Sequence, residues 1–127
     1  MSVVVDTSVW VEYFRGSGAL ELETLLDEGL VLLAPVVAAE LVSAPLRAHE
    51  RRSVIALLEP LALHPTPVEH WFAVGQLRAE LAKAGLAVST PDAHIAQCAL
   101  EARATLWSRD RIFRRISERS ELALFTP

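Results

Sequence analysis

The sequence predicts an α/β fold in which a small parallel sheet of four to five strands is covered by helices. Short runs of valine and leucine, long enough only for strands, alternate along the chain with longer amphipathic segments. Acidic residues directly follow some of these runs, as ligand-binding residues do at the carboxyl ends of parallel strands. With 127 residues the chain can build one hydrophobic core, so we expect a single domain over residues 1–127.

The first part of the chain opens with three β-branched valines at positions 3–5, which favour a strand buried on both faces. Glycines then separate the following segments and give each helix a place to end. The expected order is a strand at 3–5, a helix at 9–15, a turn at 16–18, a helix at 19–28 and a strand at 30–34.

Prolines open several helices in the rest of the chain, because proline suits the first helical turn. Thr66 and Thr90 each precede such a proline and are expected to cap the helices that follow. The expected order is helices at 36–44 and 47–58, a strand at 61–64, helices at 67–83 and 91–102, a strand at 104–108, a helix at 112–116 and a strand at 122–126.

Four acidic residues stand where a parallel sheet would bring them to one edge. Asp6 and Asp110 each follow a strand directly. Glu40 lies in an otherwise apolar helix, where burial without a partner would be costly, and Asp92 lies in the first turn of another helix. Simpler explanations stay open: Asp6 caps a helix together with Ser8, and the helix dipole favours Asp92. Glu40 then lies on the surface.

A gathering of these carboxylates would need compensation. Two carboxylates about 4 Å apart repel each other by roughly 4 kcal/mol at an effective dielectric constant of about 20. Either some are protonated or a cation binds among them. Because all the ligand atoms are oxygens, the sequence predicts a site for a hard ion, Mg²⁺ or Mn²⁺.

Three aromatic residues share one face of the first helix. Trp10, Tyr13 and Phe14 have the i, i+3 and i+4 spacing of neighbours on a helix surface. Two explanations stay open. The stripe is part of the core, or it forms a groove for a partner peptide, since much aromatic surface is concentrated on one short helix.

Charge is unevenly distributed along the chain. The 12 basic and 16 acidic residues give a net charge of −4, which by itself argues against a polyanionic partner. The last quarter is nevertheless rich in arginine, at positions 103, 109, 111, 114, 115 and 119. These arginines form either a solvated helix face or a basic surface for nucleic-acid phosphates.

The remaining candidate ligands give little indication of a second site. The histidines at positions 49, 64 and 70 show no metal-ligand spacing, and we expect them at the surface or as caps. His94 is expected at the surface, with contact to a substrate phosphate as the alternative. Cys98 is the only cysteine, which excludes an internal disulfide, and is expected to be a small buried residue.

The sequence also bears on location. No apolar run is long enough to span a bilayer. The first residues lack the basic and long apolar regions of a signal peptide. We therefore expect a cytoplasmic protein without a membrane partner.

Four short motifs occur in order along the chain: Asp6-Thr7-Ser8, Pro35-x4-Glu40-Leu41, Pro91-Asp92-Ala93, and Ser108-Arg109-Asp110 followed by Phe113. Together they resemble the acidic motifs of PIN-domain ribonucleases, most of all the VapC-type toxins of bacterial toxin–antitoxin pairs. The resemblance implies a three-layer α/β/α fold with strand order 3-2-1-4-5. It also implies Mg²⁺- or Mn²⁺-dependent endonucleolytic cleavage of structured RNA such as transfer or ribosomal RNA. A cognate antitoxin and a homodimer are further implications.

The resemblance assigns roles residue by residue. The catalytic acids would be Asp6, Glu40, Asp92 and Asp110, of which Asp6, Asp92 and Asp110 would bind the metal. Ser8 and Ser108 would hydrogen-bond the ligands or bound water. One departure is Ile112, where many relatives have a further acid, so a second metal ion is less expected than a first.

Two surfaces complete the assignment. Arg109, Arg111, Arg114 and Arg115 would hold substrate phosphates on either side of the cleaved bond. The face made by Trp10, Tyr13 and Phe14 would receive the antitoxin. The reaction expected at the acids is metal-assisted hydrolysis of a phosphodiester.

Competing classes fit the residues less well. A haloacid-dehalogenase-type phosphatase needs a second aspartate where this chain has Ser8, and a phospho-receiver domain needs a lysine after a late strand, whereas Lys83 ends a helix. A serine hydrolase needs a glycine-flanked nucleophile, which Ser89 is not. The main alternative is a catalytically inactive PIN-like binding module that pairs with a protein partner.

Overall fold

The chain folds as a three-layer α/β/α sandwich in a computed structural model that describes residues 1–17 and 19–127. Gly18, in the predicted turn at 16–18, lies outside the described residues. The strands are β1 (Val3–Val5), β2 (Val31–Leu33), β3 (Ala62–Leu63), β4 (Thr105–Trp107) and β5 (Ala123–Leu124). The helices are α1 (Thr7–Phe14), α2 (Ala19–Asp27), α3 (Pro35–Val42), α4 (Ala48–Leu58), α5 (Val68–Lys83), α6 (Thr90–Ala102) and α7 (Arg111–Ser117).

The five strands form one parallel sheet with the order β3-β2-β1-β4-β5, which confirms the predicted order. The first strand lies at the centre, where Val3 is in register with Val31 on one side and Thr105 on the other. All three valines of β1 are at most 1% exposed. The continuous run of β-branched residues is therefore explained by burial of both faces of the central strand.

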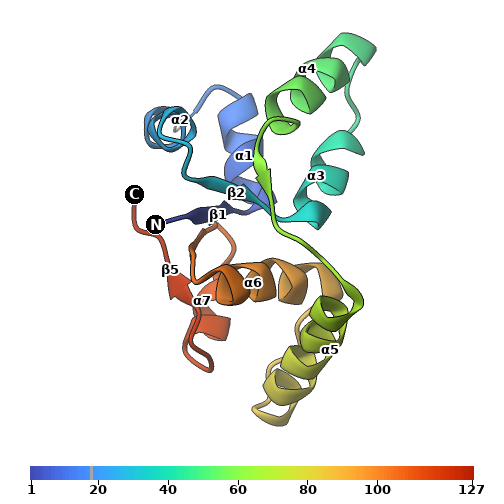
Figure 1. Ribbon diagram of the computed structural model, residues 1–127, viewed down its shortest axis with the longest axis vertical. Helices are drawn as coiled ribbons and strands as arrows, with labels where there is room; N and C mark the ends of the chain where they lie inside the picture. The colour runs from blue at the N-terminus through green and yellow to red at the C-terminus, as the bar shows by residue number, and fades with distance from the viewer. Residues whose placement is uncertain (18) are drawn as a thin grey trace.

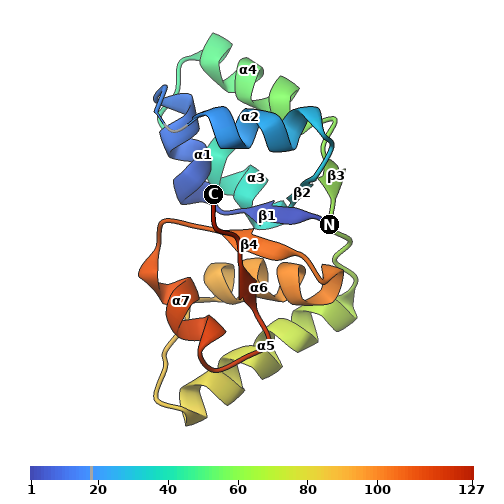
Figure 2. The same cartoon turned by 90° about the vertical axis from the view of Figure 1, so that its left-hand side faces the viewer.

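Helices cover both faces of the sheet (Figure 1, Figure 2). In both views α1, α2 and α4 lie on one side of the sheet, and α5, α6 and α7 lie on the other. Helix α3 packs against α1, α4 and α6. Because α6 also contacts β1 and β4, its first turn is held close to the carboxyl ends of the two central strands.

Two predicted helix caps differ from the structure. Ser89, rather than Thr90, caps α6, and its Oγ accepts a hydrogen bond from the Asp92 backbone N–H at 3.2 Å. Helix α5 begins one residue later than predicted, so Pro67 occupies the cap position and Thr66 provides no capping hydrogen bond. In both cases the backbone dihedral angles, which a short motif does not determine, decide which residue adopts the extended cap conformation.

The core combines valine and leucine from the sheet with aromatic residues from helices and from β4. Trp10 of α1, Trp107 of β4 and Phe113 of α7 are at most 2% exposed and belong to this core. In the part of the chain that the structure describes, every helix is too short or too polar to cross a membrane.

Candidate active site

Asp6 lies at the carboxyl end of the central strand β1 and is only 6% exposed. Its Oδ2 accepts hydrogen bonds from Ser8 Oγ at 2.6 Å, Ser108 Oγ at 2.8 Å and the Ser8 backbone N–H at 3.3 Å. Asp6 is thus the N-cap of α1, as the simpler explanation held, but its burial and its bond to Ser108 go beyond a cap. Within the described residues, its other carboxylate oxygen accepts no hydrogen bond and is free for a ligand.

Glu40 is brought to the same edge by α3. Its Oε1 accepts a hydrogen bond of 2.6 Å from Thr7 Oγ1, one residue after Asp6. Glu40 is exposed to solvent, so its carboxylate lies at the surface rather than in the core. Glu40 therefore lies on the surface, as the simpler explanation held, and Thr7 holds its carboxylate beside the start of α1.

Asp110 follows the neighbouring strand β4 and caps α7. Its Oδ1 accepts a hydrogen bond from the Ile112 N–H at 3.1 Å, while its own N–H donates to Ser108 Oγ at 2.9 Å. The Ser108 hydroxyl in turn donates to Asp6, so it joins the ends of β1 and β4. Two residues more than 100 positions apart are therefore held in one local arrangement.

Asp92 lies in the first turn of α6, and its pKa is affected by the other three acids nearby. Burial raises its pKa above the ordinary value, and a hydrogen bond with Ser89 opposes this. The carboxylates of Asp110, Asp6 and Glu40 raise the pKa of Asp92 further. We call Asp6, Glu40, Asp92 and Asp110 the acidic cluster.

The acidic cluster lacks a compensating positive charge. Within residues 1–17 and 19–127, no lysine or arginine forms an ion pair with any of its four members. The nearest candidate along the chain, Arg109, pairs with Glu12 instead, with 2.9 Å between Nε and Oε2. An uncompensated set of carboxylate oxygens, one of them on a buried aspartate, has the chemistry of a site for a hard divalent cation.

The four predicted substrate-binding arginines line one hollow next to the acidic cluster. The hollow has a volume of about 710 Å³, and its lining includes Ser108, Asp110 and Phe125. Arg111, Arg114 and Arg115 are exposed there. Arg109 lies over the Trp107 ring, 6.0 Å from its centroid, and is held by Glu12. Three arginines are therefore available to a polyanion.

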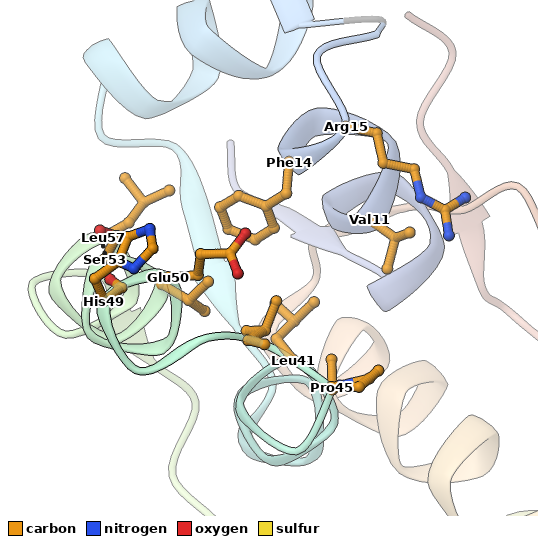
Figure 3. A pocket seen from close by; sticks show the side chains of 12 residues that line it. Val11, Phe14, Arg15, Leu41, Pro45, His49, Glu50, Ser53 and Leu57 are labelled. Atoms are coloured by element: carbon orange, nitrogen blue, oxygen red, sulfur yellow. Dashed lines mark hydrogen bonds between the residues drawn. The ribbon is translucent and has the colours of Figure 1, made fainter.

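The aromatic face of α1 is divided between core and surface. Trp10 is fully buried, so the prediction that it contacts a partner is corrected: it supports Phe14, whose ring stacks on it at 5.9 Å. Phe14 is 41% exposed and lines a groove of about 620 Å³ between α1, α3 and α4 (Figure 3). Tyr13 is partly buried and packs edge-on against both rings.

Three of the four histidines are not where the sequence analysis expected them. His64, His70 and His94 are 6%, 2% and 0% exposed, so the prediction of surface or capping positions is wrong for them. His49 is exposed, as predicted. A signal was present in α6, where His94, Cys98 and Glu101 recur at helical spacing on an otherwise apolar segment.

Comparison with known proteins identifies the family. The family model described as PIN domain matches residues 3–119, and the chain belongs to this family. Among proteins with curated functions, none matches at a significant level.

Solved structures with the same fold come from toxin–antitoxin systems. VapBC2 from Rickettsia felis, bound to a DNA fragment from its promoter, is 25% identical with a TM-score of 0.78 over 98% of both chains. VapBC-5 from Mycobacterium tuberculosis is 25% identical with a TM-score of 0.67 over 100% of both chains. VapBC-1 from nontypeable Haemophilus influenzae is 18% identical with a TM-score of 0.75, over 98% of this chain and 97% of that one. The prediction of a VapC-type PIN toxin is confirmed, and such toxins form a family of nucleases.

Proposed function

We propose that this chain is a metal-dependent endoribonuclease toxin that cleaves structured RNA and is neutralised by a cognate antitoxin. The observation that carries the proposal is the acidic cluster. The other three carboxylates lie close enough to Asp92 to raise its pKa, and no cationic side chain among the described residues pairs with any of the four. Such a set of oxygens requires a cation to be ionised together.

Asp6, Asp92 and Asp110 are the proposed ligands of Mg²⁺ or Mn²⁺. A divalent ion bound there would stabilise negative charge on the phosphate and make the attacking water more acidic. Ser8 and Ser108 fix the Asp6 carboxylate through Oδ2, which leaves the other oxygen for the ion. Ser108 also fixes the backbone of Asp110.

Glu40 is the proposed group that orients the attacking water and accepts its proton. Thr7 binds one Glu40 oxygen and leaves the other free within the described residues, next to the ligands. Arg111, Arg114 and Arg115, in the neighbouring hollow, would hold phosphates that flank the cleaved bond. These contacts position the substrate without reading its sequence.

The groove between α1, α3 and α4 is the proposed docking site of the antitoxin. Its lining is largely apolar and includes Phe14, Leu41 and Leu57, with the Glu50 side chain among them (Figure 3). Leu41 directly follows Glu40, so a bound segment can extend a basic side chain from the groove to the acidic cluster. Related solved structures are VapBC pairs, which supports such a partner.

A homodimer and a cytoplasmic location belong to the same proposal. Val68 and Phe72, 56% and 64% exposed on α5, offer an apolar surface that a second copy can cover. Structured RNA and the antitoxin would both be met in the cytoplasm.

The decisive experiment is incubation of the purified chain with total RNA in Mg²⁺, Mn²⁺ or chelator, followed by mapping of the new 5′ ends. We expect cleavage only with metal. Asp6→Asn should reduce the rate by more than about 100-fold while the fold is retained, because it removes a proposed ligand. Asp27→Asn, an exposed aspartate at the end of α2, is the matched control. Cleavage by a folded Asp6→Asn variant at the parent rate would contradict the assignment.

Absence of cleavage in every metal is the other informative result. It would favour the inactive PIN-like binding module, because partner docking needs the groove but not the acids.

A further inference from the structure

A second group of potential ligands lies between α5 and α6, away from the acidic cluster. It contains His64, His70, His94, Cys98 and Glu101, and we call it the histidine cluster. Asp92 and Glu101 lie on the same helix nine residues apart, about 14 Å along its axis. The Asp92 and Glu101 carboxylates therefore lie toward opposite ends of α6, while His94, two residues after Asp92, contacts His70 on α5.

The ligand atoms of the histidine cluster converge. His64, His70 and Cys98 each place one nitrogen or sulfur atom within 4.8 Å of the others. Glu101 Oε1 lies 2.7 Å from His64 Nε2 and 2.8 Å from His70 Nδ1. Two imidazoles and a thiol thus lie close together, and the Glu101 carboxylate contacts both imidazoles.

Three separate segments supply these groups. Cys98 and Glu101 are three residues apart on one face of α6. His70 lies in the first turn of α5, and His64 follows β3, where its backbone N–H donates to the Leu33 carbonyl at 3.0 Å. These two helices pack directly against each other (Figure 1). A ligand bound here would join the edge of the sheet to both helices.

Neighbouring side chains hold the groups in position. Gln97 Nε2 donates to Glu101 Oε2 at 2.9 Å, which turns Oε1 toward the histidines. His70 Nε2 lies 2.7 Å from His94 Nδ1, so its Nδ1 is directed at Glu101. The His94 ring stacks on Trp71 at 4.7 Å. Outer hydrogen bonds that orient imidazole and carboxylate ligands are a regular feature of metal sites.

We propose that His64, His70, Cys98 and Glu101 form a zinc site distinct from the acidic cluster. Nitrogen and sulfur ligands select borderline-soft ions such as Zn²⁺, whereas Mg²⁺ takes oxygen ligands. The four protein ligands would close the coordination sphere, as in structural zinc sites. The ion would replace the two imidazole–carboxylate hydrogen bonds, so His64 and His70 would each carry their proton on the other ring nitrogen. The Cys98 thiol would release its proton to solvent.

The alternative is a hydrogen-bonded network that never takes up an ion. Neutral histidines satisfy it: His64 and His70 each donate to Glu101, and His94 donates to the remaining nitrogen of His70. The thiol separates the two possibilities, because the network holds Cys98 Sγ only by a 3.7 Å contact with His94 Nε2, whereas zinc would bind it as the thiolate. Burial and the negative charge of Glu101 raise the pKa of Cys98 to about 12, so without an ion the thiol stays protonated.

The test is titration of the chelator-treated full chain with Co²⁺, which replaces Zn²⁺ and reports thiolate coordination by an intense near-ultraviolet charge-transfer band. We expect one equivalent to bind with this band, and Zn²⁺ to abolish it. Cys98→Ser should lose the band, and His64→Gln and His70→Gln should each weaken binding more than about tenfold. His49→Gln, on exposed α4, is the matched histidine control and should bind as the parent does.

Further variants separate this site from the acidic cluster and from misfolding. Asp6→Asn should retain the Co²⁺ band. Glu101→Gln, on a partly exposed side chain, tests the site where a buried variant fails to fold. A parent chain without a charge-transfer band and without a Zn²⁺-dependent rise in Tm would overturn the proposal. The same rise in Tm for Cys98→Ser, His70→Gln and the parent would also overturn it.

Discussion

Helix α6 begins at the acidic cluster and ends at the histidine cluster, and the two ends handle polar groups in opposite ways. At its start Asp92 faces three other carboxylates without a cationic partner among the described residues. Near its end the hydrogen bonds from His64, His70 and Gln97 outweigh the effect of burial and lower the pKa of Glu101 to about 2. At the first end, repulsion between carboxylates destabilises the fold and favours binding of a cation. At the second end, the polar groups are hydrogen-bonded to one another and stabilise the packing of α5 on α6.

The largest effect is expected at the acidic end. Asp92→Asn should lower the rate of RNA cleavage by at least about 100-fold, because it removes a proposed metal ligand. The same variant should raise Tm in chelator, since it removes repulsion from Asp110, Asp6 and Glu40. Rate assays and thermal unfolding measure the two effects. A lower Tm in chelator would contradict the unbalanced charge that we infer.

The histidine end should respond in the opposite way. His70→Leu removes a donor to Glu101 and the partner of His94, so we expect a loss of about 2 to 3 kcal/mol in the free energy of unfolding. Urea unfolding of the metal-free chain measures it, with His49→Leu as the exposed control. Unchanged stability would mean that the network contributes nothing to the packing of the two helices.

The pH dependence of stability should separate the two ends. Burial and the nearby His70 and His64 lower the pKa of His94 to about 4, against an ordinary value of 6.5. Between these values the unfolded chain binds the extra proton, so stability falls as the pH drops through this window. Between pH 7 and pH 5 this contribution amounts to about 2 kcal/mol. Urea unfolding of the metal-free chain at pH 7 and pH 5 measures it, and His94→Gln should flatten the difference.

Glu101 and Asp92 extend this contrast to lower pH. Glu101, with its lowered pKa, costs further stability as the pH falls from about 4.5 to about 2. Asp92 has a raised pKa, so its protonation in the folded state recovers stability as the pH falls. In His94→Gln the free energy of unfolding should therefore fall less steeply as the pH drops. A steeper fall than in the parent would be inconsistent with a neutral His94.

The smallest effects are expected at the arginine hollow. Arg114→Gln and Arg115→Gln should each weaken RNA binding a few-fold and reduce the slope of log Kd against log salt by about 0.7 to 0.9. Filter binding at several salt concentrations measures this, with the exposed Arg52→Gln on α4 as control. Equal slopes for the parent and all variants would mean that the arginines of the hollow do not contact the RNA.

The strands and the acidic cluster were accessible from sequence because their signals are local. Three consecutive valines and the acid that follows them place Asp6 at a strand end, and the structure has them there. Pro35 and Pro91 open the predicted helices at α3 and α6. The strand order came from the resemblance, because pairing of β1 with both β2 and β4 is decided far along the chain.

The histidine cluster was missed because its contacts are not local. His64 meets Glu101 across 37 residues, and His70 meets His94 across 24. Each histidine, considered alone, is a polar residue that is expected at the surface. The histidines and Glu101 come into contact only because α5 packs on α6. The spacing of residues along one helix does not determine which helix packs against it. Trp10 shows the same limit, since helical spacing fixes a face but not what covers it.

The hydrogen bond from Ser108 to Asp6 has a consequence for biosynthesis. These residues are 102 positions apart in a chain of 127, so the carboxylate at position 6 acquires this bond, unlike those from Ser8, only when translation is almost finished. A nascent or prematurely terminated product that ends before β4 lacks the strand beside β1 and the serine that orients Asp6. Among these contacts, such a product would keep only those from Ser8 to Asp6.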